Sequence, residues 1–372
     1  MPDGHNAPAL SPAPLMQLAS GFWAFKTLAA AEELGLFTHL AGGDGVTSTE
    51  LAQALEIHHR PAEMLLTGCT SLGLLDVTGG RYRNSTLAEE FLVQGKPYYF
   101  GGWVRMCDKR LYPGWGRLSE AIRTNRPTTW DPAKQRSLFE GEDPIVLALF
   151  WEAMHSLSTF SARALARVVD LSEVRHLLDI GRGSGAYPIE LCQAYPRLRA
   201  TVYDLPFVAE IAARKVAAAE LGNRIATQAG DFLMEERLPE GYDAVLFSMI
   251  LHDWNEEKCC AILHKCFDAL PSGGMVIISE LLVDDEKAGP APAALMSLNM
   301  LIETEGRNYT PSEYGAWLRN AGFTSIETVW FDAAGANGAV IGRKGWPSCD
   351  GKRLIWKADR AAGRCMRNPI LG

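Results

Sequence analysis

The sequence contains no long apolar run and no recognisable leader. No stretch of its 372 residues is apolar over the length needed to cross a bilayer. Residues 1–14 are rich in proline and alanine and lack the basic start and apolar centre of a secretory signal. We therefore expect a protein with no membrane partner, and we expect residues 1–14 to form a flexible N-terminus.

Acidic residues outnumber basic ones, and no excess of positive charge is present. The chain has 36 Lys and Arg against 44 Asp and Glu, a net charge of −8. A protein that mainly holds nucleic acid or an anionic membrane needs a basic footprint, so we expect no nucleic-acid partner. The apolar fraction of 47% and the charged fraction of 22% are ordinary for a globular protein. The length allows two domains with sizeable cores.

Regular patterns of cysteine and histidine are also missing. Eight cysteines are scattered along the chain with no CxxC pair, and the histidines have no spacing typical of metal ligands. We expect reduced thiols, a cytoplasmic location and no metal ion.

A glycine-rich turn follows a short apolar run near the middle of the chain. Residues 176–180 have the pattern of a buried strand, the turn GRGSG (181–185) follows at once, and 186–194 have a helical pattern. This arrangement lets the backbone approach a nucleotide-type cofactor at the carboxyl edge of a parallel sheet. A second strand, 200–204, ends in Asp204, where a carboxylate accepts hydrogen bonds from a ribose. The alternative for Asp204 is an N-cap of the next helix.

Strands and helices continue to alternate. Further strands are predicted over 226–232, 243–250 and 275–281, with helices over 208–221 and 256–270. This rhythm is typical of an α/β, doubly wound sheet. Two last strands, 324–331 and 339–344, are predicted to form an antiparallel hairpin, which most dinucleotide-binding domains lack.

The N-terminal part is mainly helical. A packing helix is predicted over 22–36, a capped helix begins near Thr47, and a hairpin covers 75–82, which together make a winged-helix layout. The helix that would read DNA, 62–74, has no Lys or Arg, whereas a major-groove reader needs basic and amide side chains. We therefore expect packing or dimerisation rather than DNA binding.

An aromatic segment lies between the helical part and the sheet part. Its aromatic residues suit a lid or connector over a pocket: Trp103, Tyr112, Trp115 and Trp130. The expected divisions are a flexible N-terminus (1–14), a winged-helix dimerisation domain (15–145), a cofactor-binding catalytic domain (146–345) and an appended tail (346–372).

Several ordered motifs resemble those of the S-adenosylmethionine-dependent small-molecule O-methyltransferases, which include plant phenolic, acetylserotonin-type and bacterial antibiotic-tailoring enzymes. The motifs lie within residues 15–344: LLDIGRGSG (177–185), YDLP (203–206), GDF (230–232), LHDW (251–254), PSGG (271–274), SLNML (297–301) and TEG (304–306). The resemblance implies a Rossmann-like methyltransferase sheet, S-adenosylmethionine as cofactor with S-adenosylhomocysteine as product, and a homodimer formed through the N-terminal domain.

The resemblance also implies a role for individual residues. The expected cofactor-binding residues are Gly181 and Gly183 at the amino-acid portion, Asp204 at the ribose, Asp231, Phe232 and Trp254 at the adenine, and Ser248 and Met249 at a strand end. The expected catalytic residues are His252, Glu280 and Asp253, and the expected acceptor-binding residues are Phe150, Met154, Asn299 and Asn308.

These roles fit methyl transfer to a small aromatic hydroxyl. A phenol is a poor nucleophile until it is deprotonated, and a histidine with an ordinary pKa of about 6.5 can take that proton near neutrality. His252 is therefore the expected general base, and a carboxylate at Glu280 would fix its tautomer. Holding the partners in line supplies much of the rate.

The sequence departs from the family pattern at two positions. Asn308 stands where the plant phenolic enzymes carry a second glutamate, and Arg182 stands inside the glycine turn, where glycine is common. Each assignment also has a local alternative. Trp254, Phe150 and Met154 could be packing residues, Asp231 could cap a turn, Glu280 could face solvent, and His252 could be an ordinary satisfied histidine.

Three other functions remain open from the sequence. A family relative could keep S-adenosylmethionine and perform hydroxylation, decarboxylation or a pericyclic reaction. An NAD-dependent oxidoreductase fits the loose glycine pattern. A DNA-binding regulator fits the winged-helix layout, but the acidic charge argues against it.

Overall fold

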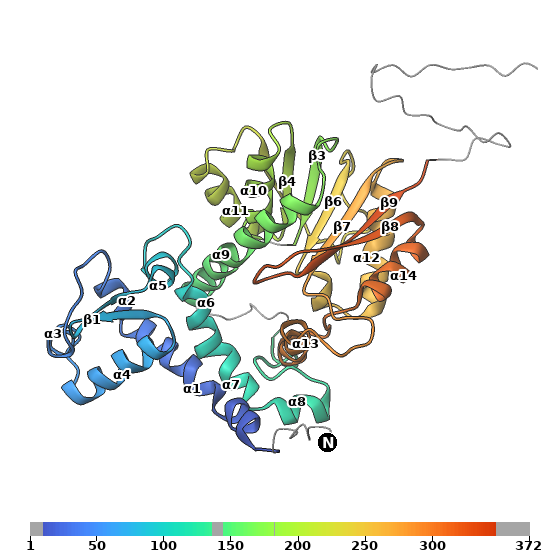
Figure 1. Ribbon diagram of the computed structural model, residues 1–372. Helices are drawn as coiled ribbons and strands as arrows, with labels where there is room; N and C mark the ends of the chain where they lie inside the picture. The colour runs from blue at the N-terminus through green and yellow to red at the C-terminus, as the bar shows by residue number, and fades with distance from the viewer. Residues whose placement is uncertain (1–9, 136–143, 182, 347–372) are drawn as a thin grey trace, which may run out of the picture.

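The structure is a computed structural model that describes residues 10–135, 144–181 and 183–346, with residues 144–149 described by their backbone alone. Figure 1 shows a helical N-terminal part and a layered sheet part, with helix α9 (Pro144–Val168) running from one to the other. Among the described residues, no helix combines the length and the apolar character needed to span a membrane.

The N-terminal part has the predicted winged-helix layout. Helices α3 (Ser48–Ala54) and α4 (His59–Ser71) are followed by an antiparallel pair of strands, β1 (Leu75–Thr78) and β2 (Arg81–Asn84). Thr47 caps α3 as predicted: its hydroxyl accepts the backbone N–H of Glu50, and the Glu50 carboxylate accepts the N–H of Thr47. This reciprocal pair satisfies two N–H groups that a helix start leaves open.

The first helix extends further toward the N-terminus than predicted. Helix α1 (Ala13–Glu33) begins inside the segment expected to form the N-terminus, ahead of the helix predicted from residue 22. Proline is tolerated in the first helical turn because no N–H is needed there. Residues 1–9 of that segment lie outside the described residues.

Two short helices, α2 (Leu36–His39) and α5 (Thr86–Phe91), contribute to the core of the N-terminal part. Further short helices lie along the chain between that core and α9: α6 (Gly101–Met106), a π-turn (Cys107–Leu111), α7 (Tyr112–Trp115) and α8 (Leu118–Thr124). The segment after α8 contacts helix α13 (Ala291–Glu303): Thr128 N–H donates to the Ile302 carbonyl, and the Trp130 indole N–H donates to the Glu303 carbonyl at 2.7 Å. The predicted connector segment therefore packs on the sheet part.

The sheet has seven strands in the order β5-β4-β3-β6-β7-β9-β8. Their bounds are β3 (His176–Ile180), β4 (Arg199–Asp204), β5 (Ile225–Ala229), β6 (Ala244–Ser248), β7 (Met275–Glu280), β8 (Phe323–Trp330) and β9 (Gly338–Lys344). Strands β3 to β7 pair in parallel, and the hairpin β8–β9 joins β7 antiparallel. The predicted doubly wound sheet with a terminal hairpin is confirmed.

Helices cover both faces of the sheet (Figure 1). One core contains residues of α12 (Glu256–Ala269) and α14 (Pro311–Ala321), and the other contains residues of α9, α10 (Ala186–Ala194) and α11 (Pro206–Ala218). The strands are buried on both sides because neighbouring residues of β6, such as Leu246 and Phe247, enter opposite cores.

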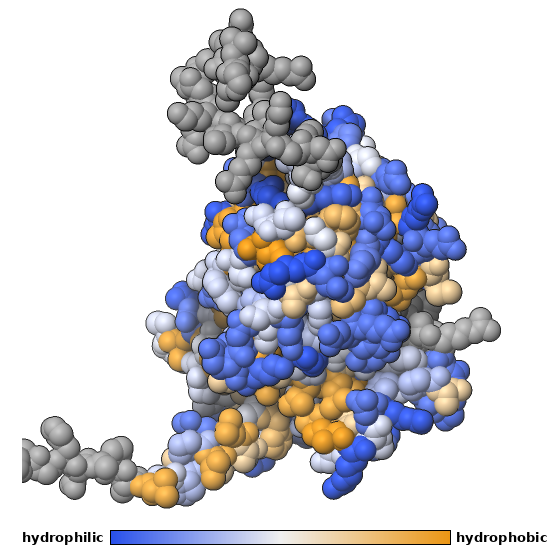
Figure 2. Space-filling model, turned by 90° about the vertical axis from the view of Figure 1, so that its right-hand side faces the viewer, coloured by the Kyte–Doolittle hydropathy of each residue, from blue (hydrophilic) through white to orange (hydrophobic). Residues whose placement is uncertain are grey.

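Apolar side chains also lie at the surface of the N-terminal part. On the face drawn in Figure 2, hydrophilic residues cover most of the middle, and apolar residues gather at the lower end, next to the start of α1. The exposed apolar residues of α1 are Leu15, Met16, Leu18, Phe22 and Trp23.

Candidate functional site

The glycine turn lies at the carboxyl edge of the sheet, between β3 and α10. Gly181, Gly183 and Gly185 all have positive φ, which favours glycine. A Cβ on Gly181 would lie 3.0 Å from the Phe232 ring, and one on Gly183 would lie 2.3 Å from the Trp151 ring. The turn therefore needs glycine for its conformation and for close approach, while Arg182 lies outside the described residues.

Asp204 ends the neighbouring strand β4 with a buried carboxylate. Its Oδ1 accepts the Leu205 N–H at 2.7 Å, whereas Oδ2 is buried without a hydrogen-bond partner among the described residues. Burial raises the pKa of Asp204 to about 7. The alternative of a helix N-cap is wrong, because Leu205 is the N-cap of α11 and no side chain caps that helix.

The expected adenine side is formed by two aromatic residues and a turn. The rings of Phe232 and Trp254 meet edge to face, with centroids 6.4 Å apart. Asp231 Oδ1 accepts the N–H groups of Leu233 at 2.9 Å and Met234 at 3.2 Å, so this carboxylate does cap its turn. Its role toward a cofactor stays a prediction.

Several buried polar atoms at this edge lack a hydrogen-bond partner within the described part of the chain. Besides Asp204 Oδ2, they are the hydroxyls of Ser184 and Ser248 and the indole N–H of Trp254. Buried polar groups are normally paired, so unpaired ones grouped along one edge indicate a missing polar ligand. The glycine turn and these atoms fit a cofactor with both hydrogen-bond donors and acceptors. The neighbouring Met249 is also buried, with a positive φ of 53°.

His252 lies beside this edge, in a 3-10 turn (Leu251–Asp253) that follows β6. Its Nδ1 is 3.2 Å from Glu280 Oε2, and its Nε2 is 3.6 Å from Asp253 Oδ1. The His252 residue is 4% exposed and Glu280 is 1% exposed, so the alternative of a solvent-facing Glu280 is wrong. The imidazole thus has a carboxylate near each nitrogen, Glu280 at Nδ1 and Asp253 at Nε2.

Glu280 is itself fixed by the turn that carries His252. Its Oε1 accepts the backbone N–H groups of Ile250 at 3.0 Å and Leu251 at 3.2 Å. One carboxylate thus holds the backbone before the histidine with one oxygen and meets the ring with the other. This arrangement favours a single orientation of the imidazole.

The expected acceptor residues of α9 lie among aromatic and apolar side chains. Met154 is buried with Trp151, and Phe150, Phe100 and Trp103 pack against them. The rings of Phe150 and Trp151 meet edge to face at 5.0 Å. Phe150 and Met154 therefore do pack, which is the alternative given for them, and their contact with an acceptor stays a prediction.

The two expected acceptor asparagines have different surroundings. Asn299 Oδ1 accepts the indole N–H of Trp115 at 3.0 Å, which links α13 to the connector segment. Asn308 is 1% exposed, and its Nδ2 donates to the Leu281 carbonyl at 2.7 Å, one residue beyond Glu280. The NH2 of Asn308 is thus occupied by backbone next to the carboxylate, whereas its Oδ1 is buried with no hydrogen-bond partner among the described residues.

Some contacts at the site had no signal in the sequence. Arg110 of the π-turn forms a largely buried ion pair with Glu303 of α13, with Nε and Oε1 2.9 Å apart. Tyr309 donates its hydroxyl to the Trp254 carbonyl at 2.7 Å. Both contacts join segments far apart in the chain, and no local pattern predicts them.

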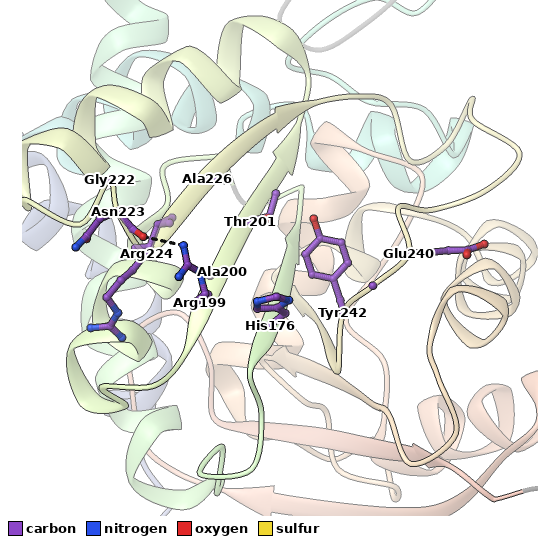
Figure 3. A pocket seen from close by; sticks show the side chains of 12 residues that line it. His176, Arg199, Ala200, Thr201, Gly222, Asn223, Arg224, Ala226, Glu240 and Tyr242 are labelled. Atoms are coloured by element: carbon purple, nitrogen blue, oxygen red, sulfur yellow. Dashed lines mark hydrogen bonds between the residues drawn. The ribbon is translucent and has the colours of Figure 1, made fainter.

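A cleft of about 360 Å³ lies at the opposite, amino end of the strands. Figure 3 shows His176, Thr201 and Tyr242 around it, with a hydrogen bond from Arg199 to the Asn223 carbonyl. His176 and Arg199 begin β3 and β4, so this cleft is separate from the carboxyl edge. Nowhere in the described ranges do three or more His, Cys, Asp or Glu side chains gather as a metal would require.

Comparison with known proteins gives the family. A model of the O-methyltransferase domain matches residues 115–324, and a model of the O-methyltransferase dimerisation domain matches residues 16–94. A 3-hydroxy-5-methyl-1-naphthoate 3-O-methyltransferase of Streptomyces sahachiroi is 53% identical, over 90% of this chain and 95% of its own. The tetracenomycin polyketide synthesis 8-O-methyl transferase of Streptomyces glaucescens is 35% identical, over 90% and 97%.

A solved structure agrees with these relatives. Human N-acetylserotonin methyltransferase in complex with S-adenosylmethionine superposes with a TM-score of 0.80 at 30% identity, covering 91% of this chain and 100% of that one. The NAD-dependent oxidoreductase and the DNA-binding regulator are thereby set aside. The chain belongs to the S-adenosylmethionine-dependent O-methyltransferase family, as the sequence motifs implied, and contains both its catalytic and its dimerisation domain.

Proposed function

We propose that this enzyme methylates a hydroxyl group of a small aromatic acceptor, with His252 as general base. The observation that carries the proposal is the buried pair formed by His252 Nδ1 and Glu280 Oε2, 3.2 Å apart, beside the glycine turn. A hydroxylated naphthoate is the acceptor class we favour, because the relative at 53% identity is named for one.

S-adenosylmethionine, when bound, supplies an electrophilic methyl group. The residues proposed to hold it are Gly181, Gly183, Asp204, Asp231, Phe232, Ser248, Met249 and Trp254, and the unpaired polar atoms at this edge support them. Asp204 Oδ2 would accept hydrogen bonds from the ribose, which offset the cost of burying its charge.

The protein's own contribution is to remove and hold one proton. His252 Nε2 accepts the proton of the acceptor hydroxyl, and the resulting phenolate oxygen is the nucleophile. The imidazolium formed is stabilised by Glu280 at Nδ1, and Asp253 Oδ1 lies 3.6 Å from Nε2. Because the pair is buried, this attraction is screened less than it would be at the surface.

The acceptor would be held between α9 and α13. Phe150 and Met154 would form an apolar wall. Asn299 would present a polar group held by its hydrogen bond from Trp115. Asn308 would be held near the acceptor by its hydrogen bond to the Leu281 carbonyl. Flat apolar walls with a few polar groups suit an aromatic ring.

We further propose a cytoplasmic homodimer with domains at 15–145 and 146–345. The dimerisation domain and the exposed apolar residues of α1 support self-association. The described cysteines are free thiols, as expected in a reducing compartment: Cys69, Cys107, Cys192, Cys259, Cys260 and Cys266.

Replacing the imidazole tests the proposed base. His252→Ala should lower kcat on 3-hydroxy-5-methyl-1-naphthoate by a factor on the order of 10²–10⁴, the usual share of a general base. Affinity for S-adenosylhomocysteine, measured by isothermal titration, should be retained. An unchanged kcat would refute the assignment of His252 as base.

A further inference from the structure

The loop between α13 and α14 packs against the back of the turn that carries His252. A Cβ built on Gly306 would lie 2.1 Å from the His252 carbonyl oxygen and 2.6 Å from the Trp254 nitrogen. No real Cβ tolerates such distances, so only glycine lets the two backbones meet. The His252 turn is therefore supported directly by this loop.

Tyr309, in the same loop, holds the end of that turn. Its hydroxyl donates to the Trp254 carbonyl at 2.7 Å, and burial raises its pKa, so it remains a neutral donor. The side chain is 3% exposed, and its ring lies edge to face against Trp317 at 4.7 Å and Tyr314 at 5.6 Å. The packed ring leaves the hydroxyl little freedom to move away from the carbonyl.

The loop also holds the strand end that carries Glu280. Asn308 Nδ2 donates to the Leu281 carbonyl at 2.7 Å, and the Tyr309 carbonyl accepts the Val283 N–H at 3.2 Å. Consecutive residues of one loop thus contact the segments after both members of the pair. A shift of this loop would change the distance between the imidazole and the carboxylate.

We infer that Tyr309 is a positioning residue for the methyl transfer: its hydroxyl fixes the end of the His252 turn, and thereby the alignment of His252 with Glu280. The inference rests on the proposed function of His252 as base. The Cys259 thiol also lies near the Trp254 carbonyl, with its Sγ 3.5 Å away, but it is closer to the Leu251 carbonyl at 3.2 Å. A thiol is a weak donor and would not replace the hydroxyl.

The neighbouring Tyr314 provides a matched control. It belongs to the same aromatic cluster and is 0% exposed, but its hydroxyl has no hydrogen-bond partner in the described part of the structure. Tyr309→Phe and Tyr314→Phe therefore each remove one buried hydroxyl and keep the ring. Only the first removes a hydrogen bond to the turn of the base, although burial and the nearby Glu280 carboxylate both raise the pKa of Tyr314.

Steady-state kinetics on 3-hydroxy-5-methyl-1-naphthoate across pH test the inference. Tyr309→Phe should lower kcat on the order of tenfold, because a small misplacement of a catalytic group is costly. The acidic limb of its kcat profile should move, since that limb reports the base in the enzyme–substrate complex. KM for the acceptor should stay within about twofold, as expected when ground-state binding of the acceptor is unaffected. Tyr314→Phe keeps the hydrogen bond to the Trp254 carbonyl, so it should move the limb less than Tyr309→Phe does.

A double variant separates the inference from the proposed function. In a His252→Gln background, Tyr309→Phe should cause no additional loss of kcat if the hydroxyl acts through the imidazole. If His252→Gln alone keeps full turnover, the proposed function fails and the inference fails with it. If His252→Gln loses turnover but Tyr309→Phe matches Tyr314→Phe in kcat and pH profile, only the inference is overturned.

Discussion

At the scale of single residues, the site consists of ionisable groups held away from water by the fold. Asp204, His252 and Glu280 are all buried, and each ends or follows a strand of the parallel sheet. A buried carboxylate is costly unless it receives hydrogen bonds. Glu280 accepts them from backbone, whereas Asp204 Oδ2 receives none from the described residues.

Cofactor binding should therefore depend on the protonation of Asp204. Because the pKa of Asp204 is about 7, its carboxyl group is mostly protonated in the free enzyme at pH 6. A ribose diol, by contrast, binds the ionised carboxylate. Binding then releases a proton, and affinity for S-adenosylhomocysteine should rise about tenfold from pH 6 to pH 8 before levelling off. Isothermal titration at each pH measures this rise.

Asp204→Asn is the control for the Asp204 prediction. The amide cannot titrate, so its weaker affinity should be the same at both pH values. A wild-type affinity that does not change between pH 6 and pH 8 would count against a ribose-binding role for Asp204.

At the scale of elements, strongly patterned segments were predictable and irregular ones were not. The predicted helix 186–194 coincides with α10, and the terminal hairpin is present as β8 and β9. The strand predicted over 243–250 ends earlier, at Ser248, because Met249 adopts a positive φ although residues 249 and 250 are buried. A run of apolar residues indicates which side chains are buried, whereas the end of a strand depends on where its backbone stops pairing with the neighbouring strand.

A second strand and a helical segment of the connector also differ from the prediction where local pattern is uninformative. The strand predicted over 226–232 ends at Ala229, which places Asp231 and Phe232 in the turn beyond it. The π-turn Cys107–Leu111 was not predicted, since an extra residue in a helical turn has no local signature.

The candidate site was predictable only where motifs carry it. His252 and Glu280 lie together as the family motifs implied, although 28 positions separate them in sequence. The contacts of Tyr309 and Gly306 with the His252 turn were not predictable, because they arise from packing between two loops. Such contacts depend on the tertiary structure and leave no periodic pattern.

At the scale of the whole molecule, helix α1 exposes several large apolar side chains close together. Leu18 is 80% exposed and Phe22 is 49% exposed. Contiguous exposed apolar residues mark association surfaces. We therefore expect the double variant Leu18→Glu, Phe22→Glu to sediment near the chain mass of 40.7 kDa, and the wild type near twice that mass.

Trp330→Glu is the matched control for association, because Trp330 is 55% exposed on β8, outside the N-terminal part. It should remain a dimer. A wild-type chain that sediments at the mass of one copy at micromolar concentration would contradict the proposed assembly.

The central claim is that His252 activates the acceptor by removing its proton. Comparing the rates for two acceptors of different acidity tests this claim most directly. The rate loss in His252→Gln should be large for a naphthol that is protonated at the assay pH. It should largely disappear for a nitro-substituted naphthol that is already ionised, because no base is then needed. An equal loss for both acceptors would contradict the account.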